Sequence, residues 1–376
     1  MHPQSLDEKP LLGGRHASTD WHLIGVVVYS IKHAVGVPEM KIPGCWQFSM
    51  KCSVITCLMM STALIMSSCS KKENGSISAP PPVTPQNSFW SISFPVAARG
   101  WVSGDSGRIY RTTDGGDTWL PQVSHTVDRL LGSFFADSIN GWMVGSSGRV
   151  LRTANGGDEW IVQNSGTTNE LSSAYFVSAS TGWAVGDGGV ILKTTDGGLG
   201  WNLQSSGTFQ YLYSAVFTGP RAGWVVGNIG IALRTTDGGQ TWNTRFVSEQ
   251  RLQSITFVDS LTGWVAGALG AIVRTTNGGV IWTVAYTTTG QLRHISFTDR
   301  LTGWAVGQNG ATTVILKTMD GGSTWSDQSI NTSFDAHAAA FRNGTLGWIA
   351  GADGKLLKTL DGGMHWSTVI VDPGTN

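Results

Sequence analysis

Residues Gly182–Trp201 read Gly-Trp-Ala-Val-Gly-Asp-Gly-Gly-Val-Ile-Leu-Lys-Thr-Thr-Asp-Gly-Gly-Leu-Gly-Trp, and this phrase decides the fold because it recurs along the chain. Seven copies are present, each with one tryptophan near its start and another at its end. The first tryptophans are Trp101, Trp142, Trp183, Trp224, Trp264, Trp304 and Trp348. The second are Trp119, Trp160, Trp201, Trp242, Trp282, Trp325 and Trp366. The step between copies is 40 or 41 residues, and once 44, where Ala311, Thr312 and Thr313 are extra.

The period predicts a β-propeller, because units of about forty residues with strand-like runs between glycine turns are typical of propeller blades. In the copy quoted above, Leu171–Phe176 alternates and predicts the first strand, and Gly182–Gly186 predicts the second. A two-residue turn at Asp187-Gly188 leads to a third strand over Val190–Thr194, and Trp201 opens the outer strand.

We therefore predict an all-β fold, a seven-bladed β-propeller of four-stranded antiparallel blades over residues 88–374. The blades are expected at about 88–128, 129–169, 170–210, 211–250, 251–290, 291–334 and 335–374. The sequence leaves the closure of the ring open. Either each blade is self-contained, or residues 82–88 add an edge strand.

The turn after the third strand carries an Asp-box pattern, Ser/Thr-x-Asp-x-Gly-x-Thr-Trp, which is complete at Thr112–Trp119, Thr235–Trp242 and Thr318–Trp325. An Asp or Asn oxygen at this place can accept hydrogen bonds from backbone N–H groups of its own turn. We therefore expect a structural role for the whole column. Its members are Asp114, Asn155, Asp196, Asp237, Asn277, Asp320 and Asp361.

Two further columns repeat without exception. A phenylalanine stands seven residues before each first tryptophan, and we expect it in the core: Phe94, Phe135, Phe176, Phe217, Phe257, Phe297 and Phe341. The other column is basic: Arg111, Arg152, Lys193, Arg234, Arg274, Lys317 and Lys358. Strict repetition favours a structural interpretation, in which each cation braces its own blade over an aromatic face or against a turn carboxylate. The alternative is a positive ring that holds an anionic partner.

Composition excludes several function classes. The formal net charge is zero, so the chain lacks the basic footprint of a nucleic-acid-binding protein. All four cysteines, Cys45, Cys52, Cys57 and Cys69, precede the repeats, which therefore offer no cysteine-ligated metal site. His294 and His337 fall in neighbouring blades but lack a third ligand. We expect neither a metal nor a cofactor.

The segment before the repeats resembles a bacterial lipoprotein leader. Lys51, an apolar stretch and Met66-Ser67-Ser68-Cys69 make residues 50–69 similar to a signal peptide with a lipobox, whose cysteine would be lipidated at Cys69. The alternatives are an ordinary secretory signal or a membrane anchor. Residues 1–49 are then an upstream extension, or else a disordered arm, and the Pro/Ser-rich residues 70–87 a flexible tether. This interpretation predicts a lipid-anchored protein of the cell envelope.

The phrase Gly-Trp-x-Val-Gly-x-x-Gly-x-Ile-x-Arg-Thr-x-Asp-Gly-Gly-x-Thr-Trp resembles the repeat of the photosystem II stability/assembly factor family, over Phe89 to about Val371. The resemblance implies a seven-bladed propeller that chaperones membrane-complex assembly without catalysis, with cyanobacterial members lipid-anchored in the thylakoid. It also implies a protein partner, such as a membrane-complex subunit, bound by a basic patch made of the arginines of the repeat and of the segments leading into each blade. This chain departs from the pattern in its zero net charge and in the lysines at three of its seven ring positions.

The copies differ most at thirteen and eleven residues before each first tryptophan, where one blade hands over to the next. The earlier column is Ser88, Arg129, Glu170, Tyr211, Arg251, Gln291 and Asp335. The later column is Trp90, Leu131, Ser172, Tyr213, Gln253, Arg293 and His337. These positions are expected to ring one mouth of the central channel, opposite the Asp-box turns. Our hypothesis is a partner site there, with Arg129, Tyr211, Tyr213, Arg251 and Arg293 as anchors and Trp90 and His337 beside them. The alternative is neutral variation on a solvated rim.

The sequence favours a binding module over an enzyme. A sialidase-like propeller needs an arginine triad, a tyrosine nucleophile with a glutamate beside it, and usually an Arg-Ile-Pro motif, which the repeats lack. Glycosidases need two carboxyl groups facing one site. Glu170 and Asp335 are the only such candidates at the mouth, and they lie several blades apart. We therefore expect a monomeric, non-enzymatic binding module. The alternatives are a true photosystem II assembly factor, in the thylakoid lumen of a photosynthetic organism, and an Asp-box glycan-binding protein or glycosidase.

Overall fold

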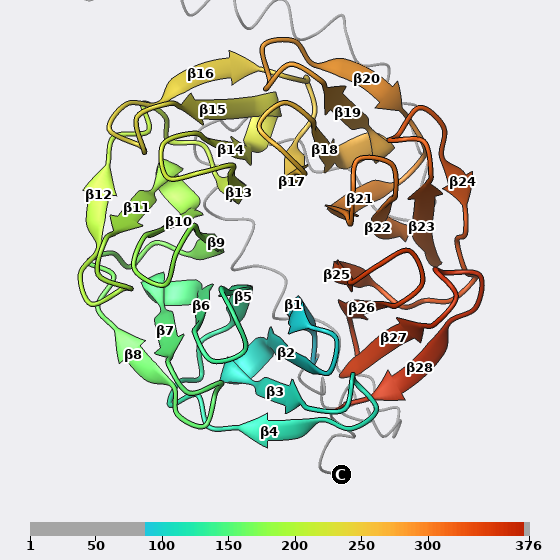
Figure 1. Ribbon diagram of the computed structural model, residues 1–376, viewed down its shortest axis with the longest axis horizontal. Coiled ribbons are helices and arrows are strands. Elements are labelled where there is room, and N and C mark those ends of the chain that lie inside the picture. The colour runs from blue at the N-terminus through green and yellow to red at the C-terminus, as the bar shows by residue number, and fades with distance from the viewer. Residues whose placement is uncertain (1–86, 372–376) are drawn as a thin grey trace, which may run out of the picture. The chain divides into compact units, whose positions relative to one another are not determined.

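A computed structural model describes residues 87–371, which form a ring of seven blades (Figure 1). Each blade is a four-stranded antiparallel sheet whose strands follow one another in the chain. The predicted fold class, a seven-bladed propeller, is thus confirmed. Cys69, the leader and nearly all of the tether lie outside the described residues, and so does most of the edge strand predicted for residues 82–88.

The first four blades are made of the following strands. Blade one holds β1 (Phe89–Val96), β2 (Arg99–Gly104), β3 (Ile109–Thr112) and β4 (Leu120–Gln122). Blade two holds β5 (Leu130–Phe135), β6 (Gly141–Gly145), β7 (Val150–Thr153) and β8 (Ile161–Gln163). Blade three holds β9 (Leu171–Phe176), β10 (Gly182–Gly186), β11 (Ile191–Thr194) and β12 (Asn202–Gln204). Blade four holds β13 (Leu212–Phe217), β14 (Gly223–Gly227), β15 (Ile231–Thr235) and β16 (Asn243–Phe246).

The last three blades follow the same plan. Blade five holds β17 (Leu252–Phe257), β18 (Gly263–Gly267), β19 (Ile272–Thr275) and β20 (Thr283–Tyr286). Blade six holds β21 (Gln291–Phe297), β22 (Gly303–Asn309), β23 (Thr312–Thr318) and β24 (Ser326–Asp327). Blade seven holds β25 (Ala336–Phe341), β26 (Gly347–Gly351), β27 (Lys355–Thr359) and β28 (Ser367–Ile370). The first strand of each blade lies nearest the centre of the ring and the fourth lies outermost (Figure 1).

Short 3-10 turns join the second and third strands of the first five blades. They are η1 (Asp105–Gly107), η2 (Ser146–Gly148), η3 (Asp187–Gly189), η4 (Asn228–Gly230) and η5 (Ala268–Gly270). The expected two-residue turn at Asp187 is therefore one residue longer. Blade six instead extends β22 and β23 into a longer hairpin, which absorbs the three extra residues Ala311–Thr313.

One aromatic joint recurs at every blade boundary. The first tryptophan of each blade lies parallel to the phenylalanine of the next blade, as Trp183 does to Phe217. Ring centroids are 3.5 to 3.9 Å apart in six joints, whereas Trp224 and Phe257 lie 6.4 Å apart. Each phenylalanine also meets the second tryptophan of its own blade edge-on, as Phe217 meets Trp242. Such pairs add about 0.5–1.5 kcal/mol to the area they bury.

The aromatic columns are not equally buried. All seven first tryptophans are buried, but among the second tryptophans only Trp160 and Trp325 are. Phe257 and Phe297 are also only half-buried, unlike the other five phenylalanines. The expected core position of the phenylalanine column therefore holds fully for five of its seven members.

The glycine before each first tryptophan makes room for this joint. A Cβ at Gly182 would clash with the ring of Phe176, which folds over that glycine to reach the tryptophan of the preceding blade. The same clash occurs in every copy of the repeat, as at Gly100 with Phe94 and at Gly347 with Phe341. The Gly-Trp pair is therefore required by packing across the boundary.

The basic column strengthens the same boundaries. Lys193, Arg234, Arg274 and Lys317 each lie over the first tryptophan of their own blade, at 5.2 to 5.9 Å from the ring centroid. The sequence predicted that each cation braces its own blade, over an aromatic face or against a turn carboxylate, but several of these cations also bind the Asp-box turn of the next blade. Lys193 Nζ donates to the Gly238 carbonyl at 2.8 Å, and Arg111 Nη1 pairs with Asp158 at 2.6 Å.

The ring closes through the same contacts, without a strand shared between blades. Trp348 of the last blade stacks on Phe94 of the first at 3.6 Å, and Lys358 Nζ pairs with Asp117 at 2.6 Å. Arg342 Nη1 donates to the Phe94 carbonyl at 3.1 Å. Within the described residues, each blade is self-contained, and closure is one more copy of the joint used everywhere else.

The Asp-box turns are held by hydrogen bonds to their acidic or amide side chain. Asp320 Oδ1 accepts from the Thr324 amide at 2.9 Å, and its Oδ2 accepts from the Thr324 hydroxyl at 2.7 Å. Asn155 Oδ1 likewise accepts from the Glu159 amide at 3.0 Å. The hydroxyl and amide of Thr324 together lower the pKa of Asp320 to about 2. An amide oxygen is thus enough for the turn, and a carboxylate adds charge-assisted bonds.

We expect Phe94→Ala to lower the free energy of unfolding by about 3–5 kcal/mol, because it leaves a cavity at the closing joint. Urea denaturation monitored by tryptophan fluorescence measures the change. Phe209→Ala is the control, since that side chain is 92% exposed, and it should alter the free energy by less than about 0.5 kcal/mol. Equal effects of the two substitutions would show that the stack does not hold the ring closed.

We expect Asp320→Asn to weaken the acid dependence of stability. The folded pKa of Asp320, about 2, lies below the ordinary value of 3.8, so its stabilisation is complete above that value and is lost as pH falls toward 2. Melting temperatures between pH 5 and pH 2 should therefore fall less steeply in the variant. The reverse change, Asn155→Asp, should steepen the fall. Identical slopes for all three proteins would contradict the assignment.

Candidate functional site

The two variable columns meet at one mouth of the central channel. They line a pocket of about 460 Å³ that includes every residue of both columns except Ser88. The mouth lies opposite the Asp-box turns, because Gly186 pairs with Leu171 at one end of the blade and Gly182 pairs with Phe176 and Thr194 at the other. All seven residues proposed for partner binding lie in this pocket, namely Trp90, Arg129, Tyr211, Tyr213, Arg251, Arg293 and His337.

The mouth residues contact their neighbours across each blade boundary. Arg129 Nε pairs with Asp105 at 3.0 Å, and Ser146 Oγ donates to Glu170 at 3.0 Å. Gln291 Nε2 donates to Gln253 at 2.7 Å. These residues differ from blade to blade, yet several of them bond the residue that faces them across the boundary.

The closing boundary carries the densest group of mouth contacts. The rings of Trp90 and His337 stack with their centroids 3.9 Å apart. The guanidinium of Arg129 also lies over the Trp90 ring, 5.4 Å from its centroid. His337 Nε2 lies 3.2 Å from Asp335, whose other oxygen pairs with Arg293 at 2.8 Å. Arg129 and Arg293 therefore have carboxylate partners already, which reduces their capacity to bind a further anion.

Two tyrosines and Arg251 form the opposite side of the mouth. Tyr211 donates its hydroxyl to Glu170 at 2.6 Å, and burial together with this carboxylate raises the pKa of Tyr211. Tyr213 lies 4.5 Å from Tyr211 and donates to the Asn228 side chain at 3.1 Å. Arg251 lies over the Tyr213 ring at 5.8 Å. Within residues 87–371 Arg251 forms no ion pair, and its buried Nε has no hydrogen-bond partner. Arg251 is thus the mouth arginine best placed to take an outside acceptor.

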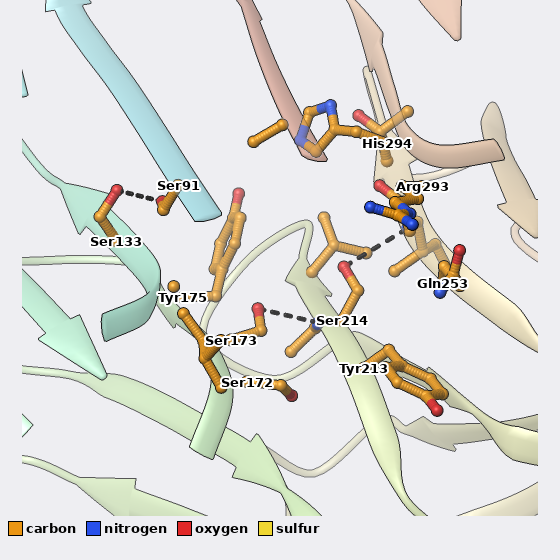
Figure 2. A pocket seen from close by; sticks show the side chains of 18 of the residues that line it. Ser91, Ser133, Ser172, Ser173, Tyr175, Tyr213, Ser214, Gln253, Arg293 and His294 are labelled. Carbon is orange, nitrogen blue, oxygen red and sulfur yellow. Dashed lines mark hydrogen bonds between the residues drawn. The ribbon is translucent and has the colours of Figure 1, made fainter. Parts of the chain in front are cut away.

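Below the mouth, the channel is lined by small hydroxyl side chains. Figure 2 shows Ser91 bonded to Ser133, and Ser173 and Ser214 directed at neighbouring strands. Ser173 and Ser214 each accept a hydrogen bond from a backbone N–H of the next blade, and the Ser91–Ser133 bond joins blades one and two. His294 also faces this space, and burial lowers its pKa to about 4, which keeps its ring neutral. The channel wall is therefore polar but carries little charge.

Both carboxylates of the mouth have hydrogen-bond partners within the propeller. Glu170 accepts from Tyr211 and Ser146, while Asp335 is held by Arg293 and His337. Among residues 87–371, no group of three or more His, Cys, Asp or Glu side chains could hold a metal ion. Over the same part of the chain, no helix has the length and apolar character needed to cross a membrane.

The mouth face is asymmetric in a feature that sequence analysis missed. The middle residue of each 3-10 turn has a positive φ, and blades one to three place Ser106, Ser147 and Gly188 there. Blades four and five place Ile229 (φ 47°) and Leu269 (φ 54°) there instead. Bulky side chains in this region cost about 1–3 kcal/mol each. The signal was visible in the repeat as a third variable column, but only the left-handed backbone shows that these residues are unfavourable in their turn.

The fold and its turns define this protein as an Asp-box β-propeller. The chain belongs to the family described as photosynthesis system II assembly factor YCF48, whose model matches residues 82–162, 122–207, 199–286 and 282–375. A comparison with curated proteins gives no match.

Solved structures share the fold at low identity. YCF48 bound to a D1 peptide is 20% identical with a TM-score of 0.60, covering 73% of this chain and 93% of that one. YCF48 from Cyanidioschyzon merolae is 21% identical with a TM-score of 0.60, covering 73% and 96%. The GH74 enzyme of Niastella koreensis is 15% identical with a TM-score of 0.62, covering 75% of this chain and 53% of its own. These likenesses show the propeller fold alone.

Proposed function

We propose that this protein is a non-enzymatic, protein-binding propeller that acts as a scaffold in the assembly of a membrane complex. The observation that carries the proposal is the mouth pocket, where the two most variable columns of the repeat meet around Arg251. Membership of the YCF48 family supports an assembly role, and one family structure holds a D1 peptide. Tyrosine and arginine are also the side chains most enriched at energetic centres of protein interfaces.

The alternatives have weaker support. A role in photosystem II itself rests on the family name and on the relative bound to a D1 peptide. A glycosidase role rests on the shared fold of the GH74 enzyme, and the mouth carboxylates Glu170 and Asp335 belong to blades that are not neighbours, which argues against a facing pair. We therefore place the strict photosystem II role second and catalysis last.

The binding site is tested with Arg251→Gln in the full-length protein, using chemical cross-linking in intact cells followed by mass spectrometry. Losing a buried cation that meets a partner acceptor costs about 2–5 kcal/mol, so partner recovery should fall at least about tenfold. Arg245→Gln is the matched control, because Arg245 is exposed on the outer strand β16 of blade four. Unchanged recovery of every partner with Arg251→Gln would refute the mouth as the site.

We also propose that lipid on Cys69 tethers the propeller to an envelope membrane, with residues 70–87 as the linker. The lipobox-like Met66-Ser67-Ser68-Cys69 supports this proposal. Cys69→Ser should move the protein from the membrane fraction to the soluble fraction, as measured by immunoblot. A variant that stays with the membrane would rule out the lipid as the anchor.

A further inference from the structure

Three consecutive blades depart from the repeat on the face that carries the mouth. Blade four has Ile229 and blade five has Leu269 at the turn position where blades one, two, three and seven have Ser106, Ser147, Gly188 and Asp353. Blade six replaces the turn by its longer hairpin, which contacts the blade-five side through the bond from Asn309 Nδ2 to Thr289 at 2.8 Å. The departures are therefore clustered in one sector and not scattered around the ring.

Neither substitution is explained by packing within the propeller. Ile229 and Leu269 are each 63% exposed, so they fill no part of the core. Both adopt a left-handed backbone that disfavours branched side chains, so they work against the turn that contains them. A residue that strains its own turn and stays mostly exposed points to a contact outside the chain.

Two exposed aromatic residues stand just before and at the end of blade four, and together with Ile229 and Leu269 they make the group that we name the apolar shoulder: Phe209, Ile229, Phe246 and Leu269. Phe209 is 92% exposed and Phe246 is 71% exposed. Phe246 pairs with Ile231, two residues after Ile229, while Phe209 stands two residues before Tyr211. Clusters of exposed large apolar side chains mark interaction sites in soluble domains.

The apolar shoulder adjoins the part of the mouth that contains Arg251, the arginine without an ion pair among the described residues. Ile229 follows Asn228. The side-chain oxygen of Asn228 accepts a hydrogen bond from the Tyr213 hydroxyl, and its backbone N–H donates to the Tyr211 carbonyl. Leu269 follows Ala268, whose amide donates to the Arg251 carbonyl at 2.9 Å. The apolar and cationic parts are therefore held together by the same backbone bonds.

We propose that the apolar shoulder and Arg251 together dock one segment of a partner protein, with apolar side chains on the shoulder and a carboxylate at Arg251. Charge complementarity selects the carboxylate, since Arg251 lacks an acidic partner among the described residues. A membrane surface fits less well, because anionic lipid requires several exposed cations and the loop beside Arg251 presents the exposed Glu249. The inference rests on the proposed function and specifies the chemistry of the partner.

The test uses a displayed library of random peptides, selected on the full-length protein. Selected peptides should carry apolar residues next to Asp or Glu. Their affinity should fall at least about tenfold with Ile229→Ser plus Leu269→Ser, and likewise with Arg251→Gln. The matched control is Leu199→Ser plus Val280→Ser, two aliphatic residues that are 70% and 68% exposed in Asp-box turns on the opposite face. The control should bind like the wild type.

A stability measurement separates lost contacts from lost folding. Serine is the residue that the repeat itself uses in this turn, so the melting temperature of the shoulder variant should equal or exceed that of the wild type. Peptides that bind the shoulder variant as tightly as the wild type, yet are lost with Arg251→Gln, would overturn this inference and leave the proposed function standing. Peptide binding insensitive to both variants would overturn both.

Two other outcomes would assign the patch to a different occupant and so overturn the inference. One is binding of the wild type, but not of the shoulder variant, to phosphatidylcholine vesicles containing phosphatidylglycerol. The other is a wild-type dimer in sedimentation that becomes a monomer in the shoulder variant.

Discussion

A stacked indole and phenyl ring at each blade boundary is the contact on which this propeller depends. Every blade supplies its tryptophan forward and its phenylalanine backward, so no blade can bury its aromatic residues alone. The ring closes because Trp348 of the last blade stacks on Phe94 of the first, although the two residues lie near opposite ends of the propeller sequence. The joint between Trp224 and Phe257, with centroids 6.4 Å apart, is looser and borders the sector that carries Ile229 and Leu269.

The repeated residues serve mainly to hold the propeller together. Several of the cations lie over tryptophans or reach the next Asp-box turn, the Asp-box oxygens hold their own turns, and the glycines clear space for the rings. Many of these groups therefore already have a partner inside the propeller. Specificity must therefore come from positions where the blades differ, which is why the mouth pocket and the apolar shoulder carry our proposals.

The side chains at the mouth differ between blades and at the same time connect neighbouring blades. Residues such as Glu170, Tyr211, Gln253 and Gln291 differ between blades, yet they bond each other across boundaries and so help to align the inner strands. Arg251 stands apart, because it lies over Tyr213 without an ion pair in the described chain. The mouth residues can thus vary between blades and still be ordered by contacts with one another, while the side chain of Arg251 keeps an unpaired hydrogen-bond donor.

The sequence by itself determined the fold, since a period near forty with invariant Gly-Trp and Asp-box signals admits few other architectures, and it placed both variable columns at one mouth. Local pattern is enough there, because each blade is stabilised by the same residues at the same spacing. Only the tertiary structure decided which mouth arginines are paired, how the ring closes, and that Ile229 and Leu269 strain their turns. Those facts depend on which side chains of different blades face one another and on backbone angles, and neither is encoded in the period of the repeat.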